Sequence, residues 1–461
     1  MQAVEEKMTD VGRKRSRHAK QSLISVKSMT FFVVLFLIAV ISLIMPLRPS
    51  VSNIEKRELE KFPEFTLESF IDGTYYKQID TWFSDTFPLR EILLSGSMKV
   101  KNLYGIHSEE VHGNFVEGDE IPTGDEDFDD ILVEMPDNDS INDTGSTEQS
   151  DIVVNNGGGE VTLAPEVHGA VYVSGDRAFG FYGFDLNTAK RYVNMINSVT
   201  EKLNGTADVY DIVVPTNIGI YLDDDMQKKL NVSNQKESID FIYKNIGDNT
   251  KKVEVFDAIK NNNSEYLYFR TDHHWTALGA YYAYQEFCKV HNMKATPVEE
   301  YEQVVFPGFL GSFYAEAGQP QSLSANPDIV IAYKPKSTNK FIFTDTEGNS
   351  MEWEIISDVS DWNANAKYMC FISGDRPFSV IDNPEINDGT SCVIIKESYG
   401  NAFVPFLVDN YDKVYVVDYR YYQENLVEFV KNNNVNDVIF LNNIQGACTS
   451  QLVSNMERIT N

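Results

Sequence analysis

The run Ser391-Cys-Val-Ile-Ile-Lys-Glu-Ser398-Tyr-Gly-Asn401 places a serine and a glycine directly after a short apolar segment. Two similar apolar segments follow it, at 414–417 and 437–441, and each also ends in polar residues. Short segments rich in Val and Ile and bounded by polar residues are typical of buried strands. Because ligands bind outside the carboxyl ends of strands in open α/β sheets, we expect a functional site where these strands end.

The chain upstream of this run alternates strand and helix patterns, which is typical of a layered α/β domain. Strands are expected at 170–173, 208–214 and 253–256, an amphipathic helix at 185–203, and a further helix with Thr276 as its N-cap. The region from about 300 to 365 is less regular. We therefore predict an α/β domain over residues 161–461, with a layered parallel sheet and helices on both faces.

The motif Thr271-Asp272-His273-His274-Trp275-Thr276 lies directly before that helix. In an extended segment, side chains two positions apart point to the same side, so Asp272 and His274 can face one target while His273 faces away. This is the arrangement of an orienting acid and a general base. With Ser398 as the nucleophile, these residues favour a serine acyl-transfer site.

Other interpretations of these residues stay open. Ser398 can be only the N-cap of the next helix, and Lys396 stands where an α/β-hydrolase elbow has its first glycine. Asp272 and His274 can be a structural pair or metal ligands, although no third ligand lies at a recognisable spacing, and we expect no metal or other cofactor. Arg420, at a strand end, can be a surface residue or a donor to an oxyanion or an anionic sugar.

The composition and charge distribution indicate a globular protein with a membrane anchor. With 461 residues and 42% hydrophobic content, the chain can bury a sizeable core. The formal charge of -30 argues against nucleic acid as a partner. A basic stretch over residues 1–28 precedes an apolar run at 29–47, which predicts a cytoplasmic tail and a single transmembrane helix, with the rest of the chain outside the cytoplasm. A cleaved signal peptide is the alternative.

Two further segments lie between the anchor and the α/β domain. Residues 50–106 carry charged and aromatic residues at helical spacing, so we expect a helical juxtamembrane stem over 48–116. Residues 117–160 are rich in Asp and Glu and contain no Lys or Arg, so we expect a flexible acidic insertion. A calcium site is the alternative for this insertion, although the spacing matches no EF-hand loop. The four cysteines match no disulfide framework and no zinc motif.

The motif at 271–276 resembles the signature of the DHHW family, which belongs with SGNH-hydrolase-like proteins similar to alginate O-acetyltransferases. Further blocks agree with this resemblance in the same order: Phe62-Pro63 to Arg90, Val214-Pro215, Phe309-Leu310-Gly311-Ser312, Lys396–Asn401 and Asp418–Tyr421. The resemblance covers about residues 50 to 460, apart from the acidic insertion. It implies that Ser398 is the nucleophile, His274 the general base and Asp272 the orienting carboxylate.

The resemblance also has departures and open assignments. The Asp-His pair precedes the serine, the reverse of the usual order in SGNH esterases, which implies a rearranged sheet. Glu397 stands where many relatives have Asp, a change expected to matter little to the triad. The backbone N–H of Ser398 is the expected oxyanion donor, and the side-chain candidates are Arg420, Asn442, Asn443 and Asn217. Trp275 and Tyr399 are candidates for stacking on sugar faces, with core packing as the alternative.

These observations together predict a membrane-anchored, extracytoplasmic serine O-acetyltransferase or acetylesterase that acts on a cell-surface polysaccharide through an acyl-enzyme. The resemblance implies a membrane-bound O-acyltransferase as a partner that exports acetyl groups. The alternative is a non-catalytic glycan-binding or scaffold protein of the cell envelope. A contact between the Ser398 hydroxyl and His274 discriminates between the two, because a working triad needs that contact within about 3.2 Å.

Overall fold

The computed structural model describes residues 51–52, 57–58, 61–63, 65–66, 69–70, 74–87, 109–122, 152–155, 160–163 and 169–461. The chain divides into two compact units, Met1–Ser97 and Met98–Asn461. The predicted cytoplasmic tail at 1–28 and the predicted transmembrane segment at 29–47 lie outside the described residues. Within the part of the chain that the structure describes, no helix is long and apolar enough to cross a membrane.

The first unit contains helix α3 (Thr74–Asp85) and the short antiparallel strands β1 (Val51–Ser52) and β2 (Arg57–Glu58). Aromatic rings on and near the helix contact one another: the ring centroids of Phe65 and Tyr75 are 5.3 Å apart, and those of Phe62 and Trp82 are 4.8 Å apart. Helix α3 and these aromatic residues lie within the predicted stem, in the part whose aromatic residues recur at helical spacing.

The end of the predicted helical stem is a strand instead. Residues Glu109–His112 form β3, which pairs antiparallel with β6 (Val171–Ser174), and β6 also pairs with β7 (Arg177–Gly180). This three-stranded sheet has the order β3-β6-β7 and belongs to the second unit. The edge of β6 satisfies backbone groups of β3 that a helix would satisfy locally, and β3 begins after the residues whose spacing indicated a helix, which end at 106.

The first residues of the predicted acidic insertion pack on the α/β domain, in contrast to the expected flexible loop. The backbone N–H of Asp119 donates to the carbonyl of Phe184 at 2.7 Å, and its carboxylate accepts from the N–H of Leu186 at 2.9 Å. Leu186 begins helix α5 (Leu186–Leu203), whose first N–H groups have no partner within the helix. An acidic side chain is stabilised at that end by the helix dipole. Further along the insertion, β4 (Ile152–Asn155) pairs antiparallel with β5 (Glu160–Leu163).

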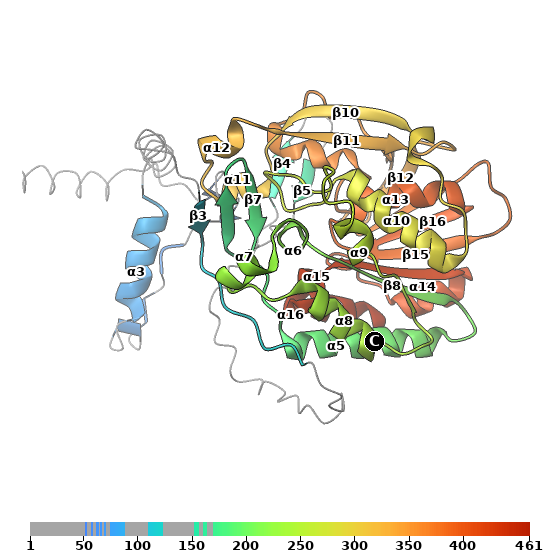
Figure 1. Ribbon diagram of the computed structural model, residues 1–461, viewed down its shortest axis with the longest axis horizontal. Helices are drawn as coiled ribbons and strands as arrows, with labels where there is room; N and C mark the ends of the chain where they lie inside the picture. The colour runs from blue at the N-terminus through green and yellow to red at the C-terminus, as the bar shows by residue number, and fades with distance from the viewer. Residues whose placement is uncertain are drawn as a thin grey trace, which may run out of the picture. The chain divides into compact units, whose positions relative to one another are not determined.

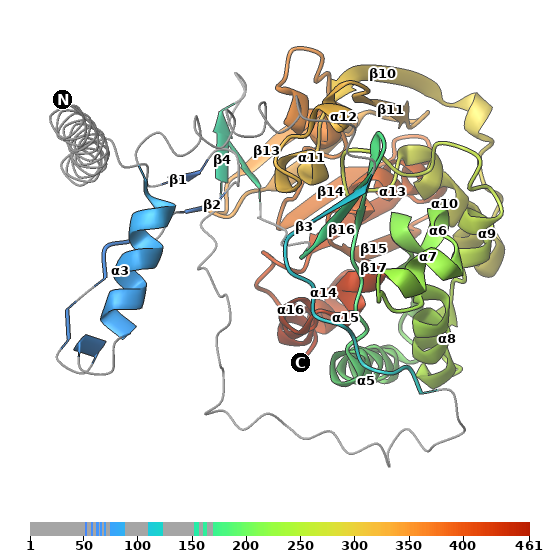
Figure 2. The same ribbon diagram turned by 60° about the vertical axis from the view of Figure 1, so that its left-hand side comes forward.

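The second unit is built on an eight-stranded sheet with the order β13-β12-β14-β16-β15-β17-β8-β9. Its strands are β8 (Asp208–Val214), β9 (Lys251–Lys252), β12 (Lys340–Thr344), β13 (Ser350–Glu354), β14 (Phe378–Asp382), β15 (Ser391–Lys396), β16 (Lys413–Asp418) and β17 (Asp437–Asn443). Figure 2 shows β16, β15 and β17 side by side. The predicted strands that correspond to β8, β15, β16 and β17 are therefore confirmed. The strand predicted at 253–256 is absent, because β9 ends at Lys252 and a helix begins at Phe256. The strand predicted at 170–173 corresponds to β6, outside this sheet.

The large sheet is mixed, whereas the sequence predicted a parallel one. Strands β16, β15, β17, β8 and β9 are parallel, and β14, β12 and β13 are antiparallel at one edge. Strands β12 and β13 lie in the region from about 300 to 365, where the sequence pattern is less regular. The turn between them is closed by the Asp345 carboxylate, which accepts from the N–H groups of Glu347 and Asn349. A turn this short joins only antiparallel strands, because parallel strands need a long crossover.

Helices cover both faces of the sheet, and Figure 1 shows α10 and α13 on one side with α5 and α16 on the other. Successive side chains of a strand point to opposite faces, so β15 contributes to both cores. Ile394 packs in the core with α10 (Ala277–His291) and α13 (Gly400–Leu407), and Val393 packs in the core with α5 and α16 (Ser450–Thr460). The Thr276 side chain caps α10 by accepting from the N–H of Gly279 at 3.3 Å, as predicted.

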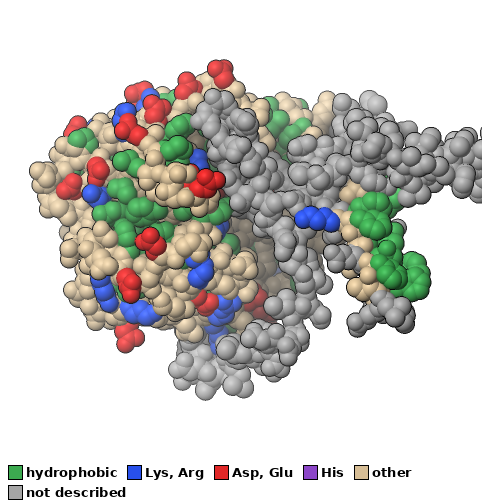
Figure 3. Space-filling view, turned by 180° about the vertical axis from the view of Figure 1, so that it is seen from behind, with side chains coloured by type: hydrophobic (Ala, Val, Ile, Leu, Met, Phe, Trp, Pro, Cys, Tyr) green, Lys and Arg blue, Asp and Glu red, His purple; other side chains and the backbone are tan. Residues whose placement is uncertain are grey.

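The remaining elements connect or flank these layers. They are α6 (Asn217–Tyr221), α7 (Asp224–Lys229), α8 (Gln235–Asn245), α9 (Phe256–Lys260), β10 (Glu302–Phe309), α11 (Ser312–Glu316), α12 (Gln321–Ser324), β11 (Asp328–Lys334), α14 (Leu426–Asn433), α15 (Ile444–Cys448) and the 3-10 turns Val298–Glu300, Ala364–Cys370 and Val408–Asn410. The four cysteines are buried and unpaired. On the face seen in Figure 3, Lys and Arg side chains are scattered among Asp and Glu and apolar side chains.

Candidate active site

The motif at 271–276 forms a loop directly before α10, and an isolated antiparallel bridge between Tyr268 and Trp275 closes it. The backbone bends at each residue from Thr271 to His274, so the extended segment that the sequence predicted is absent there. Asp272 and His274 still meet, because Oδ1 of Asp272 accepts from the backbone N–H of His274 at 3.0 Å and from its Nδ1 at 2.6 Å. A short polar side chain that accepts from a residue two positions on stabilises such a turn.

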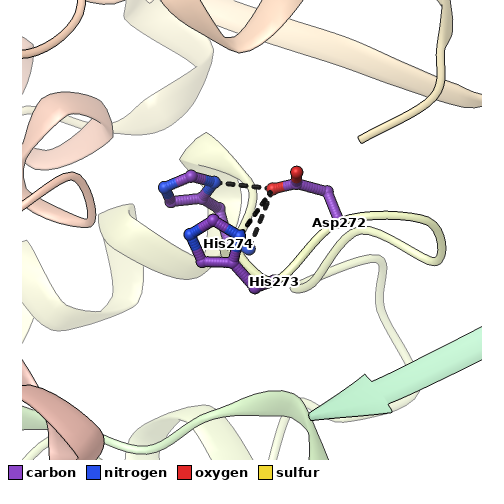
Figure 4. A group of neighbouring side chains, drawn as sticks. All are labelled: Asp272, His273 and His274. Atoms are coloured by element: carbon purple, nitrogen blue, oxygen red, sulfur yellow. Dashed lines mark hydrogen bonds and ion pairs between the residues drawn. The ribbon is translucent and has the colours of Figure 1, made fainter. Parts of the chain in front are cut away.

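His273 does not face away from this pair, in contrast to the prediction. Its ring centroid is 3.7 Å from that of His274, and its Nδ1 is 3.9 Å from Oδ1 of Asp272. Figure 4 shows both imidazole rings directed toward the same carboxylate oxygen. The bend in the backbone removes the alternation of a strand, and both rings therefore lie beside Asp272.

The carboxylate of Asp328 holds the start of this loop. Asp328 is the first residue of β11 and has no exposed surface. It accepts from the backbone N–H of Thr271 at 2.7 Å, from the hydroxyl of Thr271 at 2.6 Å and from the backbone N–H and Nε of Arg270, and it also contacts the hydroxyl of Tyr266. A buried carboxylate needs this many donors to offset its desolvation. The β10–β11 hairpin thereby fixes the loop that carries Asp272.

The segment Gly311–Ser312 orients Asp272 and His273 from the other side. The N–H of Ser312 donates to Oδ2 of Asp272 at 2.8 Å, and its hydroxyl lies 2.7 Å from Nδ1 of His273. Any side chain at Gly311 would collide with Asp272, because a Cβ there would lie 2.1 Å from Oδ2. The glycine is therefore needed for the close approach of the two loops.

Ser398 lies in the turn between β15 and α13, where the sequence placed it. Its hydroxyl is 2.7 Å from Nε2 of His274, so the contact predicted to discriminate between the two functions is present. The turn is tight, because a Cβ at Gly400 would lie 2.4 Å from Cβ of Lys396. Ser398 and His274 are separated by 124 positions in the chain and are brought together by β15 and the loop before α10.

The neighbouring Glu397 also contacts the serine. Its Oε2 lies 3.2 Å from the Ser398 hydroxyl and accepts from the N–H of Tyr399 at 2.9 Å. Its Oε1 accepts from the backbone N–H and the side-chain Nδ2 of Asn443, at 2.9 and 3.3 Å. Glu397 therefore links the carboxyl ends of β15 and β17 at the candidate nucleophile.

Tyr368 contacts both Ser398 and His274. Its ring is stacked on the imidazole of His274, with centroids 3.9 Å apart and an angle of 15° between the planes. Its hydroxyl donates to the carbonyl of Ser398 at 3.0 Å. Burial, and then the negative charges of Glu397 and Asp272, raise the pKa of Tyr368 well above its ordinary value. The phenol therefore stays protonated and acts as a donor.

The electrostatics of the pair favour an ionised Asp272. Burial alone would raise the pKa of this carboxyl, but His274, His273 and the hydrogen bonds from His274 and Ser312 outweigh burial, and the pKa lies well below its usual range. Because an ionised carboxylate only accepts, Nδ1 of His274 must carry the proton that it shares with Asp272. In the neutral imidazole, Nε2 is then the acceptor that faces the Ser398 hydroxyl.

Arg420 lies in a buried ion network. Its guanidinium donates to Asp418 at 2.7 and 2.9 Å and is 3.0 Å from a carboxylate oxygen of Asp375. Lys396, with no exposed surface, bridges the same two carboxylates at 2.9 and 3.2 Å. Asp375 also accepts from the side chain of Asn401 at 2.9 Å. Arg420 is therefore held by ion pairs with Asp418 and Asp375, which its position in the sequence did not indicate.

The other candidates are buried as well. Asn443 donates to Glu397, Asn442 donates to the hydroxyl of Tyr192 at 3.3 Å, and Asn217 donates to the carbonyl of Ala178 at 2.8 Å. Nε1 of Trp275 donates to the carbonyl of Tyr399 at 2.9 Å, and the Tyr399 hydroxyl donates to the carbonyl of His273 at 2.5 Å. Trp275 and Tyr399 are at most 1% exposed, so they pack the site from inside and present no face for a sugar.

Asp272, His273 and His274 are close enough together to share a metal ion. Hydrogen bonds occupy both ring nitrogens of His274 and Nδ1 of His273, and each oxygen of Asp272 accepts at least one hydrogen bond. A metal ion in this group would have to replace those contacts. The arrangement fits a hydrogen-bonded Asp-His-Ser chain better than a metal centre.

The fold and this geometry define an α/β protein with an Asp-His-Ser hydrogen-bond chain at the carboxyl edge of its sheet. The chain belongs to the DHHW family, because the family model described as DHHW protein matches residues 55–417. No curated protein matches the sequence.

Several solved structures are similar to this chain. A DHHW family protein from Eubacterium siraeum is 26% identical, with a TM-score of 0.57 over 67% of this chain and 99% of that one. Bacillus cereus PatB1, solved with a sulfonyl adduct, is 18% identical, with a TM-score of 0.54 over 63% of this chain and 98% of that one. The O-acetyltransferase domain of Pseudomonas putida AlgJ also matches, at 12% identity and a TM-score of 0.33, over 61% of this chain and 96% of that one.

Proposed function

We propose that this chain is a membrane-anchored, extracytoplasmic serine O-acetyltransferase or acetylesterase that acts on a cell-surface polysaccharide. The observation that carries the proposal is the continuous chain of contacts from Asp272 to His274 at 2.6 Å and from His274 to Ser398 at 2.7 Å. A buried carboxylate, an imidazole and a hydroxyl in this order are the components of nucleophilic acyl transfer.

The proposed reaction has two halves that use the same residues. Nε2 of His274 takes the proton of the Ser398 hydroxyl while Oγ attacks the acyl carbonyl of the donor, and the tetrahedral intermediate expels the donor oxygen, which takes the proton from His274. His274 then removes the proton of an acceptor hydroxyl, which attacks the acyl-enzyme. The second tetrahedral intermediate expels Oγ of Ser398, which takes that proton back from His274 and leaves the acetyl group on the acceptor. Asp272 keeps the proton on Nδ1 and stabilises the imidazolium in both halves. A sugar hydroxyl as acceptor gives transfer, and water gives hydrolysis.

The donors to the oxyanion are part of the proposal. We assign the backbone N–H of Ser398 to this role, as in other sites where the nucleophile's own N–H faces the developing charge. Asn443 and Arg420 donate to Glu397, Asp418 and Asp375 in the resting site, so they are weaker candidates than their positions at strand ends suggested.

Membership of the DHHW family and the likeness of fold to PatB1 support the proposal. A sulfonyl adduct is part of that PatB1 structure. We therefore choose an aryl sulfonyl fluoride as a probe of the candidate nucleophile here. It should modify Ser398, detected by mass spectrometry of the digested protein, and S398A should remain unmodified. S350A, which removes an exposed serine on β13, should be modified like the wild type.

The test of activity is turnover of an aryl acetate, and of an acetylated polysaccharide, by the full-length protein. S398A and H274A should each reduce kcat/KM by at least about 10³-fold, and the double variant should lose little more because the residues act as a unit. H112A, which changes a histidine on β3, should behave like the wild type. Substantial turnover by S398A would reject Ser398 as the nucleophile. A wild-type protein without turnover would reject the enzyme and leave the glycan-binding or scaffold alternative.

The proposed location and partner are tested separately. A reporter enzyme fused after residue 60 should be active only outside the cytoplasm, because the basic residues before the apolar run at 29–47 favour a cytoplasmic N-terminus. Cytoplasmic activity of the reporter would reverse the orientation. Co-purification with a membrane-bound O-acyltransferase tests the supply of acetyl groups, and activity on polysaccharide in its absence would make that partner unnecessary.

A further inference from the structure

Glu397 is a second buried carboxylate at the candidate nucleophile, and the mechanism above does not use it. It is 2% exposed and directly precedes Ser398, which is 4% exposed. Three N–H groups converge on its two oxygens, from Tyr399 and from the backbone and side chain of Asn443. N–H groups only donate, and donors that converge on a carboxylate stabilise its ionised form.

The Ser398 hydroxyl has one proton, and two described side chains offer acceptors within hydrogen-bond distance of it. Nε2 of His274 lies 2.7 Å from Oγ, and Oε2 of Glu397 lies 3.2 Å from it. The shorter contact holds the proton while His274 is neutral, because Nε2 is then an acceptor. Once Nε2 carries a proton it can only donate, and the Ser398 proton must turn to another acceptor. Oε2 of Glu397 is in position to take that hydrogen bond.

We propose that Glu397 is a positioning residue of the acyl-transfer site, which holds the Ser398 hydroxyl when His274 is protonated and stabilises the imidazolium by its negative charge. The inference rests on the proposed function for its role in turnover. Glu397 keeps its own charge throughout, and the only proton that moves passes between Ser398 and His274. The Glu397 carboxylate and the His274 imidazole both contact Oγ of Ser398. They are therefore close enough for the charge of the carboxylate to stabilise the imidazolium directly.

Other titratable groups of the described chain lie beside this pair. Among the described residues, Asp272, His273, Tyr368 and Tyr399 contact His274. Burial raises the pKa of Tyr368 and of Tyr399, so both phenols are neutral. Replacing Glu397 by glutamine leaves all of these groups in place and removes one negative charge from beside the imidazole.

The experiment follows the titration of His274 by NMR in full-length protein labelled at histidine, with H274A to assign the signal. In E397Q the midpoint of the His274 titration should fall by about one pH unit or more, because an opposite charge within about 4–6 Å favours the protonated imidazole. E397D keeps the charge and should keep a midpoint close to that of the wild type. E352Q makes the same chemical change on exposed β13 and controls for the change in net charge.

In turnover, E397Q should lower kcat with little change in KM, and the acid limb of kcat/KM should move to lower pH by the same amount as the NMR midpoint. An unchanged His274 midpoint in folded E397Q overturns the proposal. If E397Q fails to fold, E397D provides the test. A His274 midpoint that falls by a full pH unit in E397D, where the negative charge is still present, also overturns the proposal. The NMR measurement needs no substrate, so a protein without acetyl-ester turnover rejects the proposed function while the midpoint still tests Glu397.

Discussion

Single side chains decide how precisely Ser398 and His274 are held, and Tyr368 illustrates this best. The phenol ring of Tyr368 stacks on the imidazole of His274, and its hydroxyl donates a hydrogen bond to the carbonyl of Ser398. An aromatic face also stabilises an imidazolium, by its quadrupole. Tyr368 therefore positions both residues: its ring packs on His274, and its hydroxyl binds the backbone of Ser398.

The variants of Tyr368 separate these two contacts. Y368F removes only the hydrogen bond and should reduce kcat about fivefold, the equivalent of about 1 kcal/mol for one hydrogen bond. Y368L also removes the ring and should in addition shift the acid limb of the kcat/KM profile to lower pH, because the imidazolium loses its aromatic neighbour. Y282F, on the outer part of α10, is the control. A pH profile of Y368L identical to that of the wild type would limit Tyr368 to packing.

At the scale of elements, the β10–β11 hairpin positions the loop at 271–276, and Asp328 is the connection. D328N keeps the shape of the side chain but replaces an acceptor of five hydrogen bonds by an amide with a single acceptor oxygen. We expect the free energy of unfolding to fall by about 3 kcal/mol, as for other broken buried charge networks. Urea unfolding followed by circular dichroism measures this loss.

Activity of the folded D328N protein gives a second readout. Turnover should fall much more than unfolding of part of the protein would explain, because Thr271 and Asp272 lose their fixed position. D345N, in the exposed turn between β12 and β13, should change stability much less and leave turnover unaltered. Wild-type turnover in folded D328N would show that the loop holds its shape without the hairpin.

At the scale of the whole molecule, the buried Asp211 in the middle of β8 makes stability depend on pH. Burial raises the pKa of this carboxyl to about 7, although the hydrogen bond from Tyr192 opposes the rise. An aspartate in an unfolded chain has a pKa of about 3.9. The folded state therefore binds the proton more tightly, and the stability that this provides is complete below about pH 4 and is lost as pH rises to about 7.

D211N removes this dependence, because an amide does not titrate. The difference in unfolding free energy between D211N and the wild type should move in favour of the variant by up to about 1.4 kcal/mol per pH unit between pH 4 and 7. Denaturant unfolding at a series of pH values measures it. D208N, at the exposed end of the same strand, should show a much weaker trend, since solvent screens that side chain. A constant difference for D211N would contradict a raised pKa at this position.

Local sequence patterns were enough to predict the strands and helices with strong periodicity and the residues of the candidate site. Apolar periodicity marked β8, β15, β16 and β17, the cap at Thr276 marked α10, and the motif at 271–276 with Ser398 identified the groups that meet in the structure. These features are set within a few neighbouring residues, where periodicity and capping act.

Tertiary packing, in contrast, produced the mixed sheet, the bent loop that brings His273 beside His274, and the support from Asp328 and Tyr368. It also decided that Arg420 pairs with Asp375 and Asp418 and that Trp275 packs inside. The partners concerned are often far apart in the sequence, as in the 57 positions from Thr271 to Asp328 and the 30 from Tyr368 to Ser398. A hydrogen bond or an ion pair depends on distance in space, and no local pattern encodes which remote strand or loop will arrive beside a given side chain.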